Sequence, residues 1–280
     1  MNQERIPAMQ TFAIDGQQMT YRDQGTGPVL VFGHSYLWDS AMWAPQIAVL
    51  SQHYRCIVPD FWAHGGSDAA PSATCTLRDY ADNVLALLNH LEIEKFAVIG
   101  LSVGGMWGAE LALKVPARVT ALVLMDTFLG YEPEVLHTRY FAMLDTLRDQ
   151  QHVPAPLIDM IAPLFFRRDG HLHNPQLVSE FRDSLAQLQG ERAVAVSEMG
   201  RMVFGRRDTF DDIEQLTVPT LIMSGLEDNP RPPLEAQLMH DAIDGSEYVL
   251  IPEAGHISNL EQPQFVTAQL QRFLSKVLPA

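Results

Sequence analysis

Ser102 lies between two glycines in a pattern that is typical of a reactive serine. Residues 100–104 read G-x-S-x-G, an apolar run leads into them from residue 96, and a segment rich in small residues follows. A serine in this setting sits on a tight turn between a strand and a helix, where glycine avoids collisions with neighbouring backbone. The helix start behind it presents free N–H groups to a developing negative charge. We therefore predict that Ser102 is a nucleophile.

A serine hydroxyl is a weak nucleophile until a base accepts its proton, and His256 is the best-placed histidine for this role. It follows an apolar run at residues 247–252, stands in a glycine-containing loop, and comes after the serine in the chain. That order is the one expected for this serine motif. His240 is the nearest rival, but it falls in a segment with the pattern of a helix. The sequence therefore predicts His256 as the general base.

The histidine in turn needs a carboxylate that holds its tautomer and stabilises the imidazolium. Asp126 and Asp228 both follow strand-like apolar runs, so both would emerge at the edge of a parallel sheet where Ser102 and His256 emerge. The loop G-L-E-D favours Asp228, because its turn would bring the fourth residue back toward the histidine loop. Asp126 remains the alternative acid.

The elements that position these residues follow from the alternation of short apolar runs with amphipathic segments. We expect a hairpin around residues 15–16, buried parallel strands, and a sheet covered by helices on both faces. Residues 127–207 contain no strand-like run and indicate several short helices. We therefore predict a core made of residues 1–126 and 208–280, with a helical cap made of residues 127–207. The strands are expected at residues 29–32, 55–60, 96–100, 119–126, 219–225 and 247–255, and the clearest helices at residues 77–91, 103–115 and 262–277.

Two long motifs carry a resemblance to a known family. The segments GLSVGGMWGAELALKVPARVTALVLMDT and AGHISNLEQP resemble the α/β-hydrolase fold family, nearest to the branch of 3-oxoadipate enol-lactonases, related carboxylesterases and cofactor-free haloperoxidases or perhydrolases. The resemblance covers essentially the whole chain. It implies an α/β fold with a mostly parallel twisted sheet, flanking helices and a helical cap insertion. By position, it also implies His256 as the base and Asp228 as the acid.

The same resemblance implies an oxyanion hole, in which two N–H groups bind the developing negative charge. One donor is the amide of Val103, directly after the nucleophile. The other is the amide of Tyr36, because His34-Ser35 occupies the place of the family's usual His-Gly pair when the chains are aligned on Trp43. This chain departs from the family there, since serine replaces the glycine and the usual proline is absent. It departs again at residues 62–63, which read Trp-Ala where the family commonly has Arg-Gly.

Composition and charge exclude several kinds of partner. The chain of 280 residues has 19 Lys and Arg against 34 Asp and Glu, a net charge of −15, which repels nucleic acid and anionic membrane surfaces. Cys56 and Cys75 do not form a zinc pattern, and the paired histidines at 171 and 173 lack further ligands at helpful spacing. We expect no metal, no nucleotide cofactor, no membrane span, no signal peptide and a cytoplasmic location.

These observations predict an enzyme, a serine esterase or lactonase. Its substrate would be a small, largely apolar carboxylic ester or lactone, cleaved through a Ser102-His256-Asp228 triad and an acyl-enzyme. Two alternatives remain open at this point. The same triad would serve a C–C bond hydrolase or a perhydrolase, and the same fold would serve a ligand receptor with slow turnover. The natural substrate, the cap residues that line its pocket and the oligomeric state are left open by the sequence.

Overall fold

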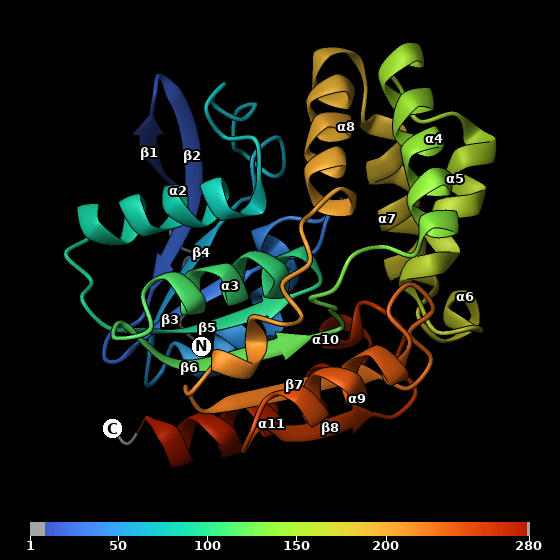
Figure 1. The fold of residues 1–280 in the computed structure, drawn as a ribbon. Coiled ribbons are helices and arrows are strands. Elements are labelled where there is room, and N and C mark those ends of the chain that lie inside the picture. Colours follow the sequence, from blue (N-terminus) through green and yellow to red (C-terminus); the bar gives the residue numbers. More distant parts are fainter. Residues whose placement is uncertain (1–8, 279–280) are drawn as a thin grey trace, which may run out of the picture.

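A computed structural model describes residues 9–278, and it contains an eight-stranded sheet flanked by helices (Figure 1). The strand order is β1-β2-β4-β3-β5-β6-β7-β8. Strand β2 pairs antiparallel with β1 and β4, and all other neighbours pair parallel. The predicted α/β fold with a mostly parallel sheet is therefore confirmed. The strands are β1 Gln10–Ile14, β2 Gln17–Gln24, β3 Val29–Gly33, β4 Arg55–Pro59, β5 Phe96–Leu101, β6 Val119–Met125, β7 Thr220–Gly225 and β8 Glu247–Ile251. The first eight and last two residues of the predicted core lie outside the described residues.

The central strands are apolar because helices cover both of their faces. Strands β5 and β7 are buried along their whole length, as the continuous apolar runs indicate. Helix α3 (Val103–Lys114) packs on β5 and β6, and α11 (Pro263–Val277) packs on β6 and against α1 (Ala44–Leu50). Helix α9 (Pro233–Ala242) packs on β7 and β8. The outer helix α2 (Leu77–His90) packs on α3, and the one-turn α10 (Ser258–Glu261) precedes α11.

Local sequence signals account for where the helices begin. Thr76 and Asp79 form a reciprocal capping box at the start of α2, in which each side chain accepts a hydrogen bond from the other residue's backbone N–H. Pro263 opens α11, where proline costs no hydrogen bond because the first helical N–H groups have no partner within the helix. These two helices lie within one or two residues of their predicted bounds.

Between β6 and β7 the described chain is helical, and it contains no strand apart from an isolated bridge between His152 and Gln189. Figure 1 shows these helices gathered beside the sheet, at the end toward which β6 points. They are therefore next to the carboxyl ends of the parallel strands, where the predicted site residues emerge. The helices of this segment are α4 Glu134–Gln150, α5 Ala155–Ile161, the 3-10 helix η2 Ala162–Phe165, α6 Gly170–His173, α7 Pro175–Gln187 and α8 Gly190–Phe204. Two further 3-10 helices, η1 (Ser40–Trp43) and η3 (Ile213–Gln215), lie in the sheet-bearing part.

Candidate active site

Ser102 occupies the sharp turn between β5 and α3. Its backbone has φ 56° and ψ −119°, a positive φ that residues other than glycine rarely adopt because of steric strain. A Cβ on Gly100 would lie 2.2 Å from the backbone of Gly104, and a Cβ on Gly104 would lie 2.2 Å from the carbonyl oxygen of Gly33. Both contacts are with backbone, which cannot move aside. The glycines of the motif are therefore required by the close packing that raises Ser102 above the sheet.

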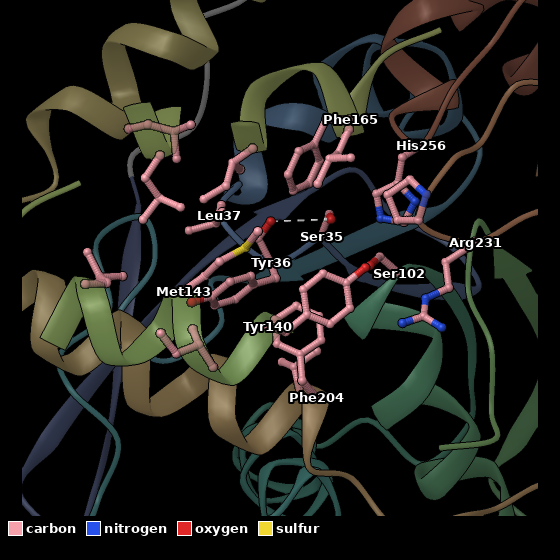
Figure 2. A pocket seen from close by; sticks show the side chains of 18 of the residues that line it. Ser35, Tyr36, Leu37, Ser102, Tyr140, Met143, Phe165, Phe204, Arg231 and His256 are labelled. Atoms are coloured by element: carbon pink, nitrogen blue, oxygen red, sulfur yellow. Dashed lines mark hydrogen bonds between the residues drawn. The ribbon is translucent and has the colours of Figure 1, made fainter. Parts of the chain in front are cut away.

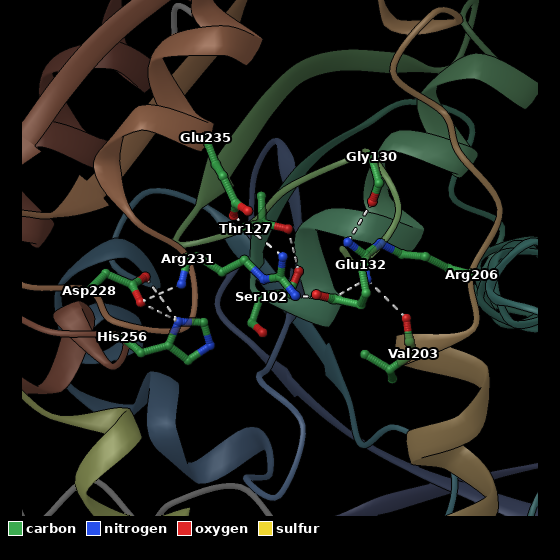
Figure 3. A network of polar contacts seen from close by, with 10 residues as sticks. All are labelled: Ser102, Thr127, Gly130, Glu132, Val203, Arg206, Asp228, Arg231, Glu235 and His256. Carbon is green, nitrogen blue, oxygen red and sulfur yellow. Dashed lines mark hydrogen bonds and ion pairs between the residues drawn. The ribbon is translucent and has the colours of Figure 1, made fainter. Parts of the chain in front are cut away.

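His256 and Asp228 lie together at the carboxyl ends of β8 and β7. The imidazole Nδ1 is 3.0 Å from Asp228 Oδ2 and 3.2 Å from Oδ1, and both residues are buried. The amide of Asp228 donates to the carbonyl of Gly225 (3.1 Å), a turn that carries the carboxylate back over the end of β7. Figure 3 shows the opposite side of the imidazole ring turned toward the Ser102 hydroxyl. With Nδ1 occupied by the carboxylate, Nε2 is the nitrogen left to accept a proton.

Asp126, the alternative acid, has different partners. Its Oδ1 accepts a hydrogen bond from the amide of Gly225 (2.7 Å), and its Oδ2 accepts one from the hydroxyl of Ser258 (2.5 Å). Within residues 9–278, no hydrogen bond joins Asp126 to His256. Burial and the nearby Asp228 carboxylate raise the pKa of Asp126 well above its usual range. Asp126 therefore braces the loops that carry Asp228 and His256.

The amides of Val103 and Tyr36 are the two predicted oxyanion-hole donors. Val103 is the first residue of α3, so its N–H has no acceptor within the helix. The loop after β3 is held by His34, whose Nε2 accepts from the Phe61 amide and whose Nδ1 is 2.8 Å from the Ser35 carbonyl oxygen. No acceptor for the Val103 or Tyr36 amide occurs among the described residues. Both N–H groups are thus available to an oxygen of a bound molecule.

A mostly apolar cavity of about 90 Å³ opens above Ser102 and His256 (Figure 2). Its walls come mainly from the loop after β3 and from helices α4, α5, η2, α7 and α8. Arg231 is the one Lys, Arg, Asp or Glu side chain among the lining residues. They are Ser35, Tyr36, Leu37, Ser102, Met106, Tyr140, Met143, Leu144, Leu147, Val153, Leu157, Ile161, Leu164, Phe165, Leu185, Val203, Phe204, Pro230, Arg231 and His256.

Arg231 belongs to a buried ion network that sequence reasoning missed. The Glu132 carboxylate accepts from both Arg231 and Arg206, and Arg231 also lies 3.4 Å from Glu235 (Figure 3). Glu132 precedes α4, Arg206 follows α8, and the amide of Arg231 donates to Asp228. The network therefore ties both ends of the helical segment to the loop of Asp228. The only sequence signal was an arginine set between prolines just after Asp228.

Trp62, His64 and His240 are not among the residues that line the cavity. Trp62 is buried and donates its indole N–H to Asn83 (2.8 Å). Burial and the neighbouring His34 lower the pKa of His64 to about 3, which keeps this ring neutral. His240 contacts the Ser246 hydroxyl at 2.7 Å. Across residues 9–278, no group of three or more His, Cys, Asp or Glu is arranged to hold a metal ion, and no helix is long and apolar enough to cross a membrane.

Comparison with known proteins gives a consistent result. Residues 28–263 match the model of the alpha/beta hydrolase fold family. The chain is 28% identical to 3-oxoadipate enol-lactonase 2 of Acinetobacter baylyi, over 89% of this chain and 91% of the relative. It is also 28% identical to an uncharacterized carboxylesterase of Bacillus subtilis, over 89% of this chain and 79% of that one.

Solved structures give the same answer. A thermophilic esterase from Thermogutta terrifontis superposes with a TM-score of 0.85 at 29% identity, covering 96% of this chain and 97% of that one. The enol-lactonase from Burkholderia xenovorans superposes with a TM-score of 0.85 at 27% identity, covering 95% and 100%. The predicted resemblance and the prediction of a hydrolase are confirmed. The chain belongs to the α/β-hydrolase fold family, and its relatives include an enol-lactonase and a carboxylesterase.

Proposed function

We propose that this protein hydrolyses a small, largely apolar carboxylic ester or lactone through Ser102, His256 and Asp228. The observation that carries the proposal is the contact of His256 Nδ1 with Asp228 beside a cavity that Ser102 also lines. A nucleophile on a strained turn, a base and a buried carboxylate are the three parts of a serine hydrolase. The relatives named as enol-lactonases and esterases support the same reaction class.

The reaction has two halves. His256 Nε2 accepts the proton of the Ser102 hydroxyl while Oγ attacks the carbonyl carbon, and the amides of Val103 and Tyr36 donate to the oxygen that becomes negative. The imidazolium then gives its proton to the departing alkoxide oxygen, which leaves an acyl-enzyme on Ser102. Water repeats the sequence and releases the acid. Asp228 accepts the Nδ1–H throughout and stabilises the positive ring.

The lining of the cavity supports this substrate class. Its lining beyond the catalytic end is aliphatic and aromatic, with residues such as Leu147, Leu157 and Leu185 at cap positions. A charged acyl chain would lose its hydration there without gaining partners. We assign residues 127–207 the role of a cap that encloses the acyl group, because helices from this segment form most of the wall.

The test is a panel of 4-nitrophenyl esters of increasing acyl length and lactones of increasing ring size, assayed with purified wild type and Ser102→Ala. Ser275→Ala, a change at an exposed serine of α11, is the matched control. The proposal expects short, uncharged substrates to be hydrolysed by wild type and the control but not by Ser102→Ala. Equal rates in all three proteins would overturn it.

A further inference from the structure

The loop after β3 carries a second hydroxyl group at the cavity. Ser35 is completely buried, yet it lines the same cavity as Ser102 and His256 (Figure 2). It stands where the family usually has glycine, so this hydroxyl is a feature of the present chain. A glycine there would leave the cavity wall without any side-chain donor at this point.

Both backbone polar groups of Ser35 have partners, which hold the residue in place within the loop. Its carbonyl oxygen accepts from the Trp38 amide (3.1 Å) and lies 2.8 Å from His34 Nδ1, and its amide lies 3.4 Å from the sulfur of Met42. These contacts come from both sides of the loop. The side chain is therefore presented from a rigid frame, as a group must be if it is to act on a transition state.

The hydroxyl itself has almost no partner. Its one hydrogen-bond partner within residues 9–278 is the carbonyl oxygen of Tyr36 at 3.5 Å, well beyond the usual 2.5–3.0 Å of an O–H···O hydrogen bond. Buried hydroxyls are normally hydrogen-bonded, and one that is not costs free energy. A bound molecule with an oxygen acceptor at this wall would satisfy it.

We propose that the Ser35 hydroxyl is a third donor to the ester carbonyl oxygen, beside the amides of Tyr36 and Val103. The inference rests on the proposed function. As the tetrahedral intermediate forms, the carbonyl oxygen gains charge and the O–H···O⁻ bond shortens and strengthens. No proton is transferred, and the hydroxyl only turns from the Tyr36 carbonyl toward the new acceptor. Ser35 is then a catalytic residue that favours the transition state over the bound ester.

The test compares Ser35→Ala with Ser224→Ala. Ser224 is an equally buried serine whose hydroxyl contacts the next carbonyl oxygen at 3.4 Å, but it lies in β7 and does not line the cavity. Ser35→Ala should lower kcat by about 10- to 100-fold, less than for loss of a sole donor because two amides remain, and change KM by less than about threefold. Inhibition by a simple alkyl boronic acid, whose adduct on a serine is tetrahedral, should weaken by the same factor. Ser224→Ala should match wild type in both.

The outcomes separate this inference from the proposed function. Unchanged kcat and boronate affinity in Ser35→Ala, or a rise in KM alone, would refute the role of Ser35 while Ser102-dependent hydrolysis stands. If the wild-type protein hydrolyses none of the esters or lactones, both the proposed function and the role of Ser35 are refuted. If Ser35→Ala does not fold, Ser35→Gly restores the residue usual in the family and must show the same loss of kcat; full activity there would also refute the inference.

Discussion

Exchanging Asp228 for asparagine is expected to disable catalysis without disturbing the fold. Asp228 accepts the Nδ1–H of His256 at 3.0 Å and an N–H from the Arg231 backbone at 2.9 Å. An asparagine can still accept one hydrogen bond through its oxygen. If the asparagine NH₂ group faces the imidazole, Nδ1 must accept a hydrogen bond from it, and the ring proton moves to Nε2. His256 then presents N–H rather than a lone pair to Ser102, and kcat should fall by about 10⁴, the loss seen in another serine hydrolase with this change.

Asp126→Asn is the matched control, because Asp126 ends the neighbouring strand and is equally buried. Its raised pKa favours the protonated carboxyl, which an asparagine resembles in shape and charge. The asparagine oxygen can keep the Gly225 amide, and its NH₂ group can donate to the Ser258 hydroxyl. The expected loss in kcat is less than about tenfold, since no group that touches the imidazole changes.

The assay is kcat and KM on one 4-nitrophenyl ester, with thermal unfolding measured alongside. The reasoning requires a large loss for Asp228→Asn, a small one for Asp126→Asn, and melting temperatures close to wild type in both. A crippled Asp126→Asn beside a mildly affected Asp228→Asn would show that the acid is on β6. That result would refute the assignment drawn from the His256 contact and leave Ser102 as the nucleophile.

Three further changes test the framework of the site. Glu132→Ala strands two buried arginines and should cost about 3–5 kcal/mol in the free energy of unfolding, whereas Asp159→Ala, which breaks an exposed ion pair, should cost less than about 1 kcal/mol; chemical denaturation measures both. Burial raises the pKa of Glu261 from 4.5 to about 7. The folded state therefore keeps the Glu261 proton to a higher pH than the unfolded state does, and the free energy of unfolding falls as pH rises from 4.5 to about 7. Glu261→Gln cannot titrate, so its free energy of unfolding should rise by about 3 kcal/mol relative to that of wild type between about pH 4 and about pH 8. Parallel profiles of unfolding free energy against pH for the two proteins would contradict this. Gly104→Ala, whose Cβ would meet the Gly33 carbonyl oxygen at 2.2 Å, should lose native folding or activity; a wild-type melting temperature and rate would contradict the steric reading.

Much of the fold and the sharp turn that carries Ser102 could be predicted because the signals are local. Continuous apolar runs are typical of strands buried on both faces, and their alternation with helical patterns indicates a parallel sheet. The glycines around Ser102 encode a steric requirement that acts within a few residues. The structure shows that requirement directly, in the 2.2 Å approach of a Gly104 Cβ to the Gly33 carbonyl.

The choice between Asp126 and Asp228 was harder, because both end parallel strands at the same sheet edge. Their tertiary contacts separate them. The Asp126 carboxylate accepts hydrogen bonds from the Ser258 hydroxyl and the Gly225 amide, whereas the turn at residues 225–228 brings Asp228 to His256. The assignment of catalytic roles to these residues remains our proposal.

The ion network and the cavity wall left almost no trace in the sequence. Glu132 and Arg231 are 99 positions apart, and nothing local marks them as partners. The apolar residues of α4, α5 and α7 divide between the interior of the helical segment and the cavity, and their spacing does not tell the two groups apart. Ser35 departs from the family's glycine in the sequence, while its place in the cavity wall depends on contacts with Trp38 and Met42.

The central claim is that Ser102 is the nucleophile, and covalent labelling tests it most directly. A fluorophosphonate reacts with a serine only where a base activates it, so the adduct reports the catalytic residue itself. Intact mass spectrometry should show one adduct per chain, peptide mapping should place it on Ser102, and hydrolysis should stop in proportion to labelling. Ser102→Ala should take up no label. An adduct on a different serine, or full hydrolytic activity in the labelled protein, would contradict the account.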